Sequence, residues 1–488
     1  MSTLPQETDV AIVGAGPVGL ALGVALAQYG VDAVVVDAAE ERSRHSKAAV
    51  VHSRTLEVLR EFGVADELVG RGVVVPYFAF RDRDRTLLTT DFSALPTPYP
   101  YTLMLPQDVT EAVLDKRLHD AGRMVERPWR VTDLQQDDAS VLLDLADGHG
   151  ATRQLRARYV VGADGAHSSV RHLLGVGFTG SAYAESFFLA DVRMDWGLSR
   201  EEVQLFFSQT GLVVVAPLPG GAHRIVATVD GPIEAARIAD VQALLTERGP
   251  RRPPAVVRDL IWSSNFRVSH RVADRYRDGR VFLAGDAGHV HSPAGGQGMN
   301  TGIQDAVNLA WKLAMVCGGR ADAELLDTYE AERRPVAQEV VRAAHRLTTL
   351  ATMHGRARRT VRNAALGLAG LLPAVPHTMA ENLSELAISY ATGPGRRGTR
   401  AGDRATADLP VPPPGAPAYR LVVPETFPHE RLTALRQAAE QQSADVVVLR
   451  AGRDASAQLV RPDGYLAAAG PADRAHDLLS TLPVRLSR

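Results

Sequence analysis

The sequence predicts an α/β protein with a doubly wound parallel sheet, a second β-sheet inserted into it and a separate C-terminal domain. Three observations support this fold class. An apolar run over residues 10–13 leads directly into a glycine-rich turn, which is typical of the first strand of such a sheet. Strand-rich aromatic segments interrupt the helical pattern further on. A stretch rich in Gly, Pro and Arg over residues 393–417 then marks a linker before the last domain.

The composition is that of an ordinary globular protein. Of the 488 residues, 45% are hydrophobic and 23% are charged, and the formal net charge is -2, which gives no reason to expect nucleic acid or an acidic membrane as a partner. The polar residues 1–9 lack the pattern of a signal peptide, and the apolar runs are too short for a membrane span. Cys317 is the only cysteine, so no intrachain disulfide can form. We therefore expect a reduced, cytoplasmic protein.

The first half of the doubly wound sheet occupies about residues 8–38. After the strand at residues 10–13, an Ala- and Leu-rich helix is expected over residues 18–29 and ends at Gly30. The apolar residues 34–36 form the second strand. This order of strand, turn, helix and strand is the dinucleotide-binding unit of α/β proteins.

The turn between the first strand and the helix has the spacing Gly-x-Gly-x-x-Gly. Gly14 allows the tight turn, Gly16 lets the backbone approach a pyrophosphate, and Gly19 lets the helix pack against the strand. The helix N-terminus offers free N–H groups to phosphate oxygens. Asp37, at the end of the second strand, is placed to accept hydrogen bonds from ribose hydroxyls. This motif predicts a dinucleotide but does not separate FAD from NAD.

Two further glycine-rich motifs follow. Asp164 stands in the first of them, Gly-Ala-Asp-Gly, just after the strand-like residues 159–161. Asp286 stands in the second, Gly-Asp-Ala-Gly, after the apolar run 281–284. A loop over residues 293–298 then enters a helix, whose N-terminal N–H groups can stabilise negative charge.

The three motifs, in this order and spacing, resemble those of the FAD-dependent aromatic hydroxylases (class A flavoprotein monooxygenases) of the para-hydroxybenzoate hydroxylase and phenol hydroxylase type. Residues 295–302 and 327–335 are most similar to those of actinobacterial aromatic polyketide hydroxylases. The resemblance implies non-covalent FAD, NADPH or NADH as a transient reductant, and O2 as co-substrate. A flavin C4a-hydroperoxide would then hydroxylate a phenolic or polycyclic aromatic substrate. The choice between NADPH and NADH stays open.

The same resemblance implies a role for individual residues. Asp286 would bind the ribityl or ribose hydroxyls of FAD, and Asp164 with Arg171 would serve both FAD and the nicotinamide donor. Lys47 and Ala49 depart from the family, which often has an arginine at the first position and, in phenol hydroxylases, an aspartate at the second. The predicted cofactor-binding set is Gly14, Gly16, Pro17, Val18, Gly19, Asp37, Lys47, Gln107, Asp164, Asp286, Gly298, Met299 and Asn300.

Catalytic candidates come from the polar residues nearest to the flavin loop. His291 and Gln297 are placed to orient a phenol, beside Pro293, Gly295 and Gly296 of the loop. A purely structural role for His291, fixing the backbone of a tight loop, is the alternative. We expect the substrate between this loop and an aromatic sheet, and strand alternation allows only one of two adjacent phenylalanines to face it. This sheet holds Phe187, Phe188, Phe206 and Phe207, and the alternation argument applies to Phe206 and Phe207, of which one belongs to the core. No metal site is predicted.

The predicted organisation is discontinuous. The FAD-binding domain with its following helices takes residues 1–75, 102–178 and 279–392, and the substrate-binding sheet takes residues 76–101 and 179–278. Residues 393–488 resemble the thioredoxin-like C-terminal domain of phenol and polyketide hydroxylases. They lack Cys-x-x-Cys, which excludes thiol redox chemistry and leaves a structural role or assembly into a homodimer.

Two rival functions stay open at this point. A Baeyer–Villiger or epoxidising monooxygenase would use the same flavin chemistry, and no motif distinguishes it from a hydroxylase. A flavin-bound redox sensor without turnover is the rival from another class, although the residues at 164–171 that resemble a nicotinamide motif argue against it.

Overall fold

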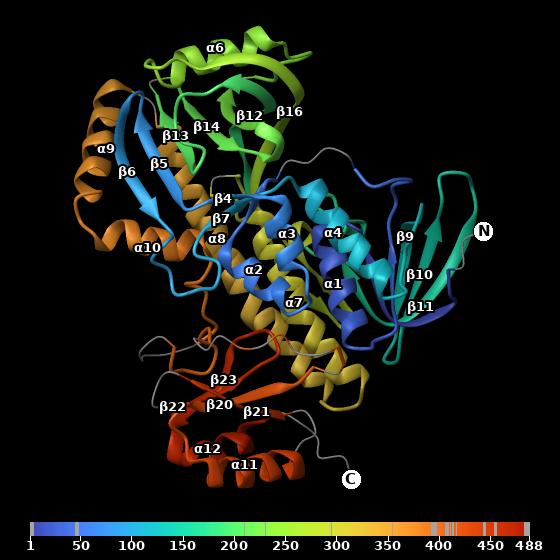
Figure 1. Cartoon of the computed structure of the whole chain (residues 1–488). Coiled ribbons are helices and arrows are strands. Elements are labelled where there is room, and N and C mark those ends of the chain that lie inside the picture. Colours follow the sequence, from blue (N-terminus) through green and yellow to red (C-terminus); the bar gives the residue numbers. More distant parts are fainter. Residues whose placement is uncertain are drawn as a thin grey trace.

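The computed structural model places the chain in three packed parts (Figure 1). It describes residues 4–482, apart from 44–47, 209, 230, 294, 354, 392–397, 406–408, 410, 412–413, 416, 443–445 and 453–455. Lys47 lies outside the described residues. Within the described part of the chain, no helix is both long enough and apolar enough to cross a membrane.

The first part is built on a sheet with the strand order β17-β18-β11-β1-β2-β8, extended by β10 and β9. Strands β1, β2, β11 and β18 run parallel, as expected for a doubly wound sheet. Its strands are β1 (Glu7–Val13), β2 (Ala33–Val36), β8 (Val125–Glu126), β9 (Arg130–Gln136), β10 (Val141–Ala146), β11 (Thr152–Gly162), β17 (Arg277–Asp278) and β18 (Val281–Leu283).

Helices cover this sheet because each carries an apolar face. Helix α1 (Pro17–Gln28) follows β1, and the residues from Val18 to Leu26 are all buried. It packs against α4 (Gln107–Asp120) and α7 (Gly298–Cys317). The helices α2 (Ser53–Arg60), α3 (Ala65–Arg71) and α5 (Ser169–Leu173) complete this part, with the small sheet β3 (Val50–Val51), β7 (Thr102–Met104) and β4 (Val73–Val75).

The second part is a sheet of mainly antiparallel strands in the order β19-β16-β12-β15-β14-β13-β5-β6. The predicted inserted sheet is therefore confirmed. Its strands are β5 (Tyr77–Asp82), β6 (Arg85–Asp91), β12 (Phe178–Asp195), β13 (Glu202–Phe207), β14 (Leu212–Pro217), β15 (His223–Val229), β16 (Val256–Ala273) and β19 (His289–Val290). Helix α6 (Ile238–Arg248) was not expected in this strand-rich segment; it buries Val241, Leu244 and Leu245 against the sheet.

Three helices follow α7 along the chain. Helix α8 (Asp327–Ala351) runs beside β16, whereas α9 (Arg356–Ala369) and α10 (Ala374–Leu383) lie against β6 of the second sheet (Figure 1). The segment 279–392, predicted to accompany the first sheet, thus also flanks the second sheet.

The C-terminal part has the strand order β21-β20-β22-β23, with β20 parallel to β21 and antiparallel to β22. Its elements are β20 (Tyr419–Pro424), α11 (His429–Gln442), β21 (Val446–Gly452), β22 (Ser456–Val460), β23 (Leu466–Pro471) and α12 (Ala475–Leu478). This is the predicted thioredoxin-like arrangement, one parallel βαβ unit extended by an antiparallel hairpin, and it lies at the foot of Figure 1.

Candidate active site

A cavity of about 1420 Å³ lies where the carboxyl ends of β1, β2 and β11 meet the second sheet. Ligands of open α/β sheets bind at this edge. The structure brings most of the predicted site residues together in its wall: Gly14, Gly16, Pro17, Val18, Asp37, Gln107, Asp164, Asp286, His291, Pro293, Gly295, Gly296, Gln297, Gly298 and Met299. Gly19 and Asn300 do not line it.

The three glycines of the glycine-rich turn have different surroundings: Gly14 and Gly19 lie too close to other backbone atoms for a side chain, whereas Gly16 lies beside open space. Gly14 has φ +105°, and a Cβ there would lie 2.4 Å from the carbonyl oxygen of Ala163 in the second motif. A Cβ on Gly19 would lie 1.9 Å from the carbonyl oxygen of Gly14. A Cβ on Gly16 would meet nothing within 4 Å, because this residue faces the cavity. Of these three glycines, only Gly16 has open space at the position of a Cβ.

Asp37 fixes the end of β2 beside this turn. Its Oδ2 accepts a hydrogen bond from the N–H of Ala15 (2.6 Å), and Oδ1 accepts from Ala39 (2.9 Å) and from Arg127 Nη1 (2.6 Å). The carboxylate lines the cavity and is held rigidly, as recognition of a diol requires.

Arg171 joins the second and third glycine-rich motifs. Its guanidinium donates to the carbonyl oxygens of Ala166 (2.8 Å) and Ala287 (2.9 Å) and lies 4.0 Å from the ring centre of Phe178. Asp164 Oδ2 accepts from the N–H of Ser169 (2.6 Å) at the start of α5. The other oxygen, Oδ1, is buried with no partner among the described residues.

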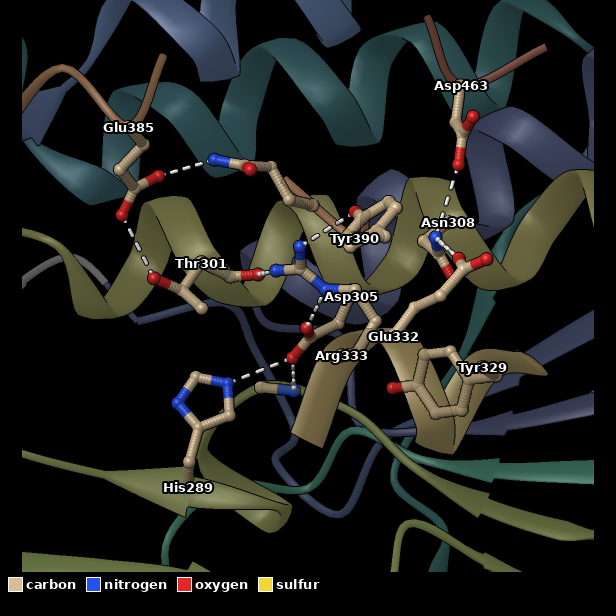
Figure 2. A network of polar contacts seen from close by, with 12 residues as sticks. His289, Thr301, Asp305, Asn308, Tyr329, Glu332, Arg333, Glu385, Tyr390 and Asp463 are labelled. Atoms are coloured by element: carbon tan, nitrogen blue, oxygen red, sulfur yellow. Dashed lines mark hydrogen bonds and ion pairs between the residues drawn. The ribbon is translucent and has the colours of Figure 1, made fainter. Parts of the chain in front are cut away.

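The turn that carries Asp286 rests on a buried polar network that sequence reasoning missed (Figure 2). Asp305 on α7 accepts from the N–H of Gly285 (3.1 Å), from His289 Nε2 (2.9 Å) and from Arg333 Nε (2.7 Å). Burial alone would raise the pKa of the Asp305 carboxyl, but Arg333 and His289 lower it below its usual value. Asp286 itself faces the cavity.

His291 and Gln297 both line the cavity, but their side chains differ in which polar atoms already have hydrogen-bond partners. Gln297 Nε2 donates to the carbonyl oxygen of Asn382 (3.1 Å) at the end of α10. His291 Nδ1 donates to the carbonyl oxygen of Ser292 (2.8 Å), and Nε2 is buried with no partner among the described residues. Burial and the neighbouring His289 lower the pKa of His291 to about 4, so Nε2 carries a free lone pair at neutral pH.

Asn300 is committed to holding the loop. Its Oδ1 accepts from the N–H of His52 (2.8 Å), and its Nδ2 donates to the carbonyl oxygens of Val50 (2.9 Å) and Gly296 (2.7 Å). His52 Nε2 donates to Gly295 (2.8 Å). The side chain of Asn300 therefore positions the loop and presents no polar atom to the cavity.

The half of the cavity wall that the second sheet and α10 form is mainly apolar. Phe207 lines it, whereas Phe206 is buried on the opposite face of β13; likewise Phe187 lines it and Phe188 does not. Arg224 on β15 is a buried cation in this wall that sequence reasoning missed, paired with Asp191 at 2.8 Å through two hydrogen bonds. The remaining apolar wall includes Phe78, Phe80, Met379 and Leu383.

Comparisons with known proteins identify the family. The family of FAD binding domains matches residues 7–344. The 6-methylpretetramide 4-monooxygenase of Streptomyces rimosus is 37% identical in sequence, and the alignment covers 96% of this chain and 92% of that protein. A rifampicin monooxygenase of Streptomyces venezuelae is 34% identical, and the alignment covers 97% of this chain and 98% of that protein. The solved anhydrotetracycline hydroxylase OxyS from Streptomyces rimosus has a TM-score of 0.79 and 32% identity, with 97% of this chain and 99% of that chain covered.

The chain belongs to the FAD-dependent aromatic monooxygenases. The cavity fits the cofactor of this family on three counts: the open face at Gly16, the unpartnered Asp164 Oδ1, and the N-terminus of α7, which begins at Gly298 in the wall. No group of three His, Cys, Asp or Glu side chains in the described part of the monooxygenase could hold a metal ion.

Arg54 on α2 has a structural role. It lies outside the cavity wall and is only 4% exposed. Its guanidinium donates to Glu57 Oε2 (2.8 Å) and to the carbonyl oxygen of Asp463 (2.7 Å) in the C-terminal domain. This residue fastens the C-terminal domain to α2.

Proposed function

We propose that this FAD-dependent monooxygenase hydroxylates a phenolic or polycyclic aromatic substrate of the polyketide type. The observation that carries the proposal is the division of the cavity into a glycine-lined polar half and an apolar, aromatic half, which meet at the loop 295–298. Two of the relatives are named for acting on 6-methylpretetramide and anhydrotetracycline. The apolar half suits a flat ring system, whereas the polar half suits a dinucleotide.

In this proposal the polar half holds FAD. Bound FAD, reduced by NADPH or NADH, supplies the activation of O2 that the protein cannot perform alone. The residues of the glycine-rich turn and the α1 N-terminus would bind the pyrophosphate, Asp37 a ribose, and Asp286 the ribityl or ribose hydroxyls. The N–H groups at Gly298 and Met299 would face the flavin and stabilise negative charge on it.

Replacement of Asp286 tests this placement. Asp286→Ala removes a charged acceptor from the cavity wall, and we expect the loss of about 1.5–3 kcal/mol of FAD binding free energy. FAD content after extensive dialysis, measured from the flavin absorbance, should fall sharply. Glu330→Gln is a suitable control, because Glu330 Oε2 binds the N–H groups of Tyr276 and Arg277 outside the cavity wall. Full retention of FAD by Asp286→Ala would remove Asp286 from the site.

His291 is the best placed proton acceptor for a phenol. Its Nδ1 holds a proton against Ser292, so Nε2 carries the lone pair that would accept the substrate proton. Nε2 is buried beside Gly298, so the substrate has to displace the loop 295–298 to reach it. Since the pKa of His291 is lowered to about 4, this base stays unprotonated throughout the range above pH 5. The apolar walls exclude water during the transfer of oxygen.

We expect His291→Ala to lower the hydroxylation rate about 10²-fold or more while leaving the FAD content unchanged. The acid limb of the pH–rate profile, where His291 becomes protonated near pH 4, should disappear in the variant. Single-turnover hydroxylation measured from about pH 3 to pH 9, which spans the pKa of His291, provides the readout. Wild-type rates and an unchanged profile in the variant would leave His291 with a structural role only.

The substrate class is tested with a panel of phenols and polycyclic aromatics. Consumption of NADPH and of NADH should each be measured with every compound, together with the mass of the product. Oxygenated product from polycyclic phenols supports the proposal. Reductant consumption without any oxygenated product across the panel would contradict it.

A further inference from the structure

Asp305 is a buried carboxylate that does not line the cavity. Its hydrogen-bond partners do not line the cavity either, but they belong to three segments that do: the turn that carries Asp286, strand β19 and helix α8. Asp305 lies on the second turn of α7 and is fully buried. It accepts hydrogen bonds from Gly285, the residue before Asp286, and from His289, two residues before His291. Figure 2 shows these contacts converging on one carboxylate.

We propose that Asp305 is the positioning residue for the turn that carries Asp286, and so for FAD retention. This inference rests on the proposed placement of FAD beside Asp286. A Cβ on Gly302 would lie 3.0 Å from the Cα of Gly285 and 2.7 Å from Val18, so α7 already packs tightly against the turn. The carboxylate adds a hydrogen bond to that packing, and this bond fixes the orientation of the Gly285 N–H group.

Arg333 binds one oxygen of the Asp305 carboxylate, Oδ1, whereas Gly285 and His289 bind the other, Oδ2. Its Nε donates to Asp305 Oδ1 (2.7 Å), Nη2 donates to the carbonyl oxygen of Thr301 (3.0 Å), and Nη1 donates to the hydroxyl of Tyr390 (3.0 Å). Asp305 and Arg333 are both completely buried, so each needs the other to offset the cost of burying its charge. Arg171 holds the opposite side of the same turn through Ala287.

The chain provides a matched control on the same two helices. Glu332, next to Arg333, pairs with Lys312 of α7 (2.8 Å) and with Arg461 of the C-terminal domain (2.6 Å). This ion pair is also largely buried, but it faces the C-terminal domain, and none of its members lines the cavity. Glu332→Gln therefore disturbs α7 and α8 without touching the turn.

The test is the rate at which FAD leaves the holoenzyme after dilution, followed by flavin fluorescence with no substrate present. We expect Asp305→Asn to speed release at least about tenfold, because the amide cannot accept from both Arg333 and the Gly285 and His289 donors. Glu332→Gln should change the release rate less than about twofold at a similar loss of melting temperature. Equal effects of the two variants, or wild-type release from Asp305→Asn, would overturn the proposal.

A second variant gives a signature that general destabilisation would not produce. In Asp305→Asn/Arg333→Met the amide can turn its oxygen to Gly285, because no cation remains to oppose its NH2 group. We expect the release rate to recover toward wild type relative to Asp305→Asn alone. Release that is as fast as or faster than in the single variant contradicts the proposal. If Asp305→Asn fails to fold, Arg333→Lys is compared with Glu332→Gln in the same assay, with the same two outcomes.

The release assay contains no aromatic compound, so it is independent of which substrate is hydroxylated. Failure of every aromatic compound to be oxygenated would overturn the proposed function and leave this assay unaffected. If the enzyme hydroxylates polycyclic phenols but Asp305→Asn releases FAD as slowly as wild type, only the positioning role of Asp305 is overturned.

Discussion

Gly14→Ala is expected to yield protein that is unstable and free of FAD. The backbone at Gly14 has φ +105°, where any other residue is strained, and the new Cβ would lie 2.4 Å from the backbone oxygen of Ala163. Neither atom belongs to a flexible side chain, so β1 and β11 would have to separate. Strain and overpacking together are expected to cost on the order of 3–5 kcal/mol of unfolding free energy.

Gly16→Ala, two residues away, separates cofactor binding from folding. Gly16 has φ -74°, which suits alanine, and its Cβ would point into open space. We expect the apoprotein of this variant to melt like wild type, because no contact is disturbed. FAD affinity should nevertheless fall at least about tenfold, since the methyl group occupies the approach of the pyrophosphate. Thermal melting and FAD titration of both apoproteins provide the measurements, and wild-type FAD affinity in Gly16→Ala would contradict the proposed site.

Glu385→Gln is expected to stabilise the protein at alkaline pH. Glu385 is buried beside α7, where it accepts from Thr301 Oγ1 (2.9 Å) and from Gln304 Nε2, as Figure 2 shows. Burial raises the pKa of Glu385 to about 8, although Thr301 and Arg333 lower it and Asp305 adds to the rise. The carboxyl is therefore protonated at neutral pH, and the amide of glutamine imitates that form.

The sign of the pH effect follows from the raised pKa. Stability from neutral Glu385 is fully present below about pH 4.5 and is lost as the pH rises through about 8. The total difference is on the order of 3–5 kcal/mol. The melting temperature of Glu385→Gln should exceed that of wild type at pH 9 and approach it at pH 5. Glu381→Gln, near the end of α10, four residues before Glu385 and partly exposed, is the control and should melt like wild type at both pH values. Parallel curves for wild type and Glu385→Gln would contradict the assignment.

Most residues predicted to bind the cofactor line the cavity, and they were accessible from the sequence because they belong to short motifs. A turn that must approach a pyrophosphate needs glycines at fixed spacing, as at Gly14 and Gly16, and Asp286 stands in the third glycine-rich motif. The presence of an inserted sheet followed from strand-rich local patterns, and the thioredoxin-like C-terminal domain followed from a resemblance; the strand order of neither was predicted. Lys47 lies outside the described residues, so its predicted role stays a prediction.

The supporting residues could not be predicted in the same way. Asp305 meets its partners 16 and 28 residues away, and Glu385 meets Thr301 across 84 residues. Buried polar side chains on apolar helices leave no local pattern, because their partners are brought together only by tertiary packing. Asn300 shows the converse: its motif is similar to that of flavin enzymes, but its side chain is used to hold Val50, His52 and Gly296.

The most direct test of the proposed function is turnover of a polycyclic phenol under isotopically labelled oxygen gas in ordinary water. The enzyme with bound FAD should consume one NADPH or NADH for each product molecule, and each product should carry one labelled oxygen atom on an aromatic ring. The label should be absent when only the water is labelled. Oxygen that enters from water, or reductant consumption that yields only hydrogen peroxide with every phenol tried, would contradict the proposal that this enzyme is an aromatic hydroxylase.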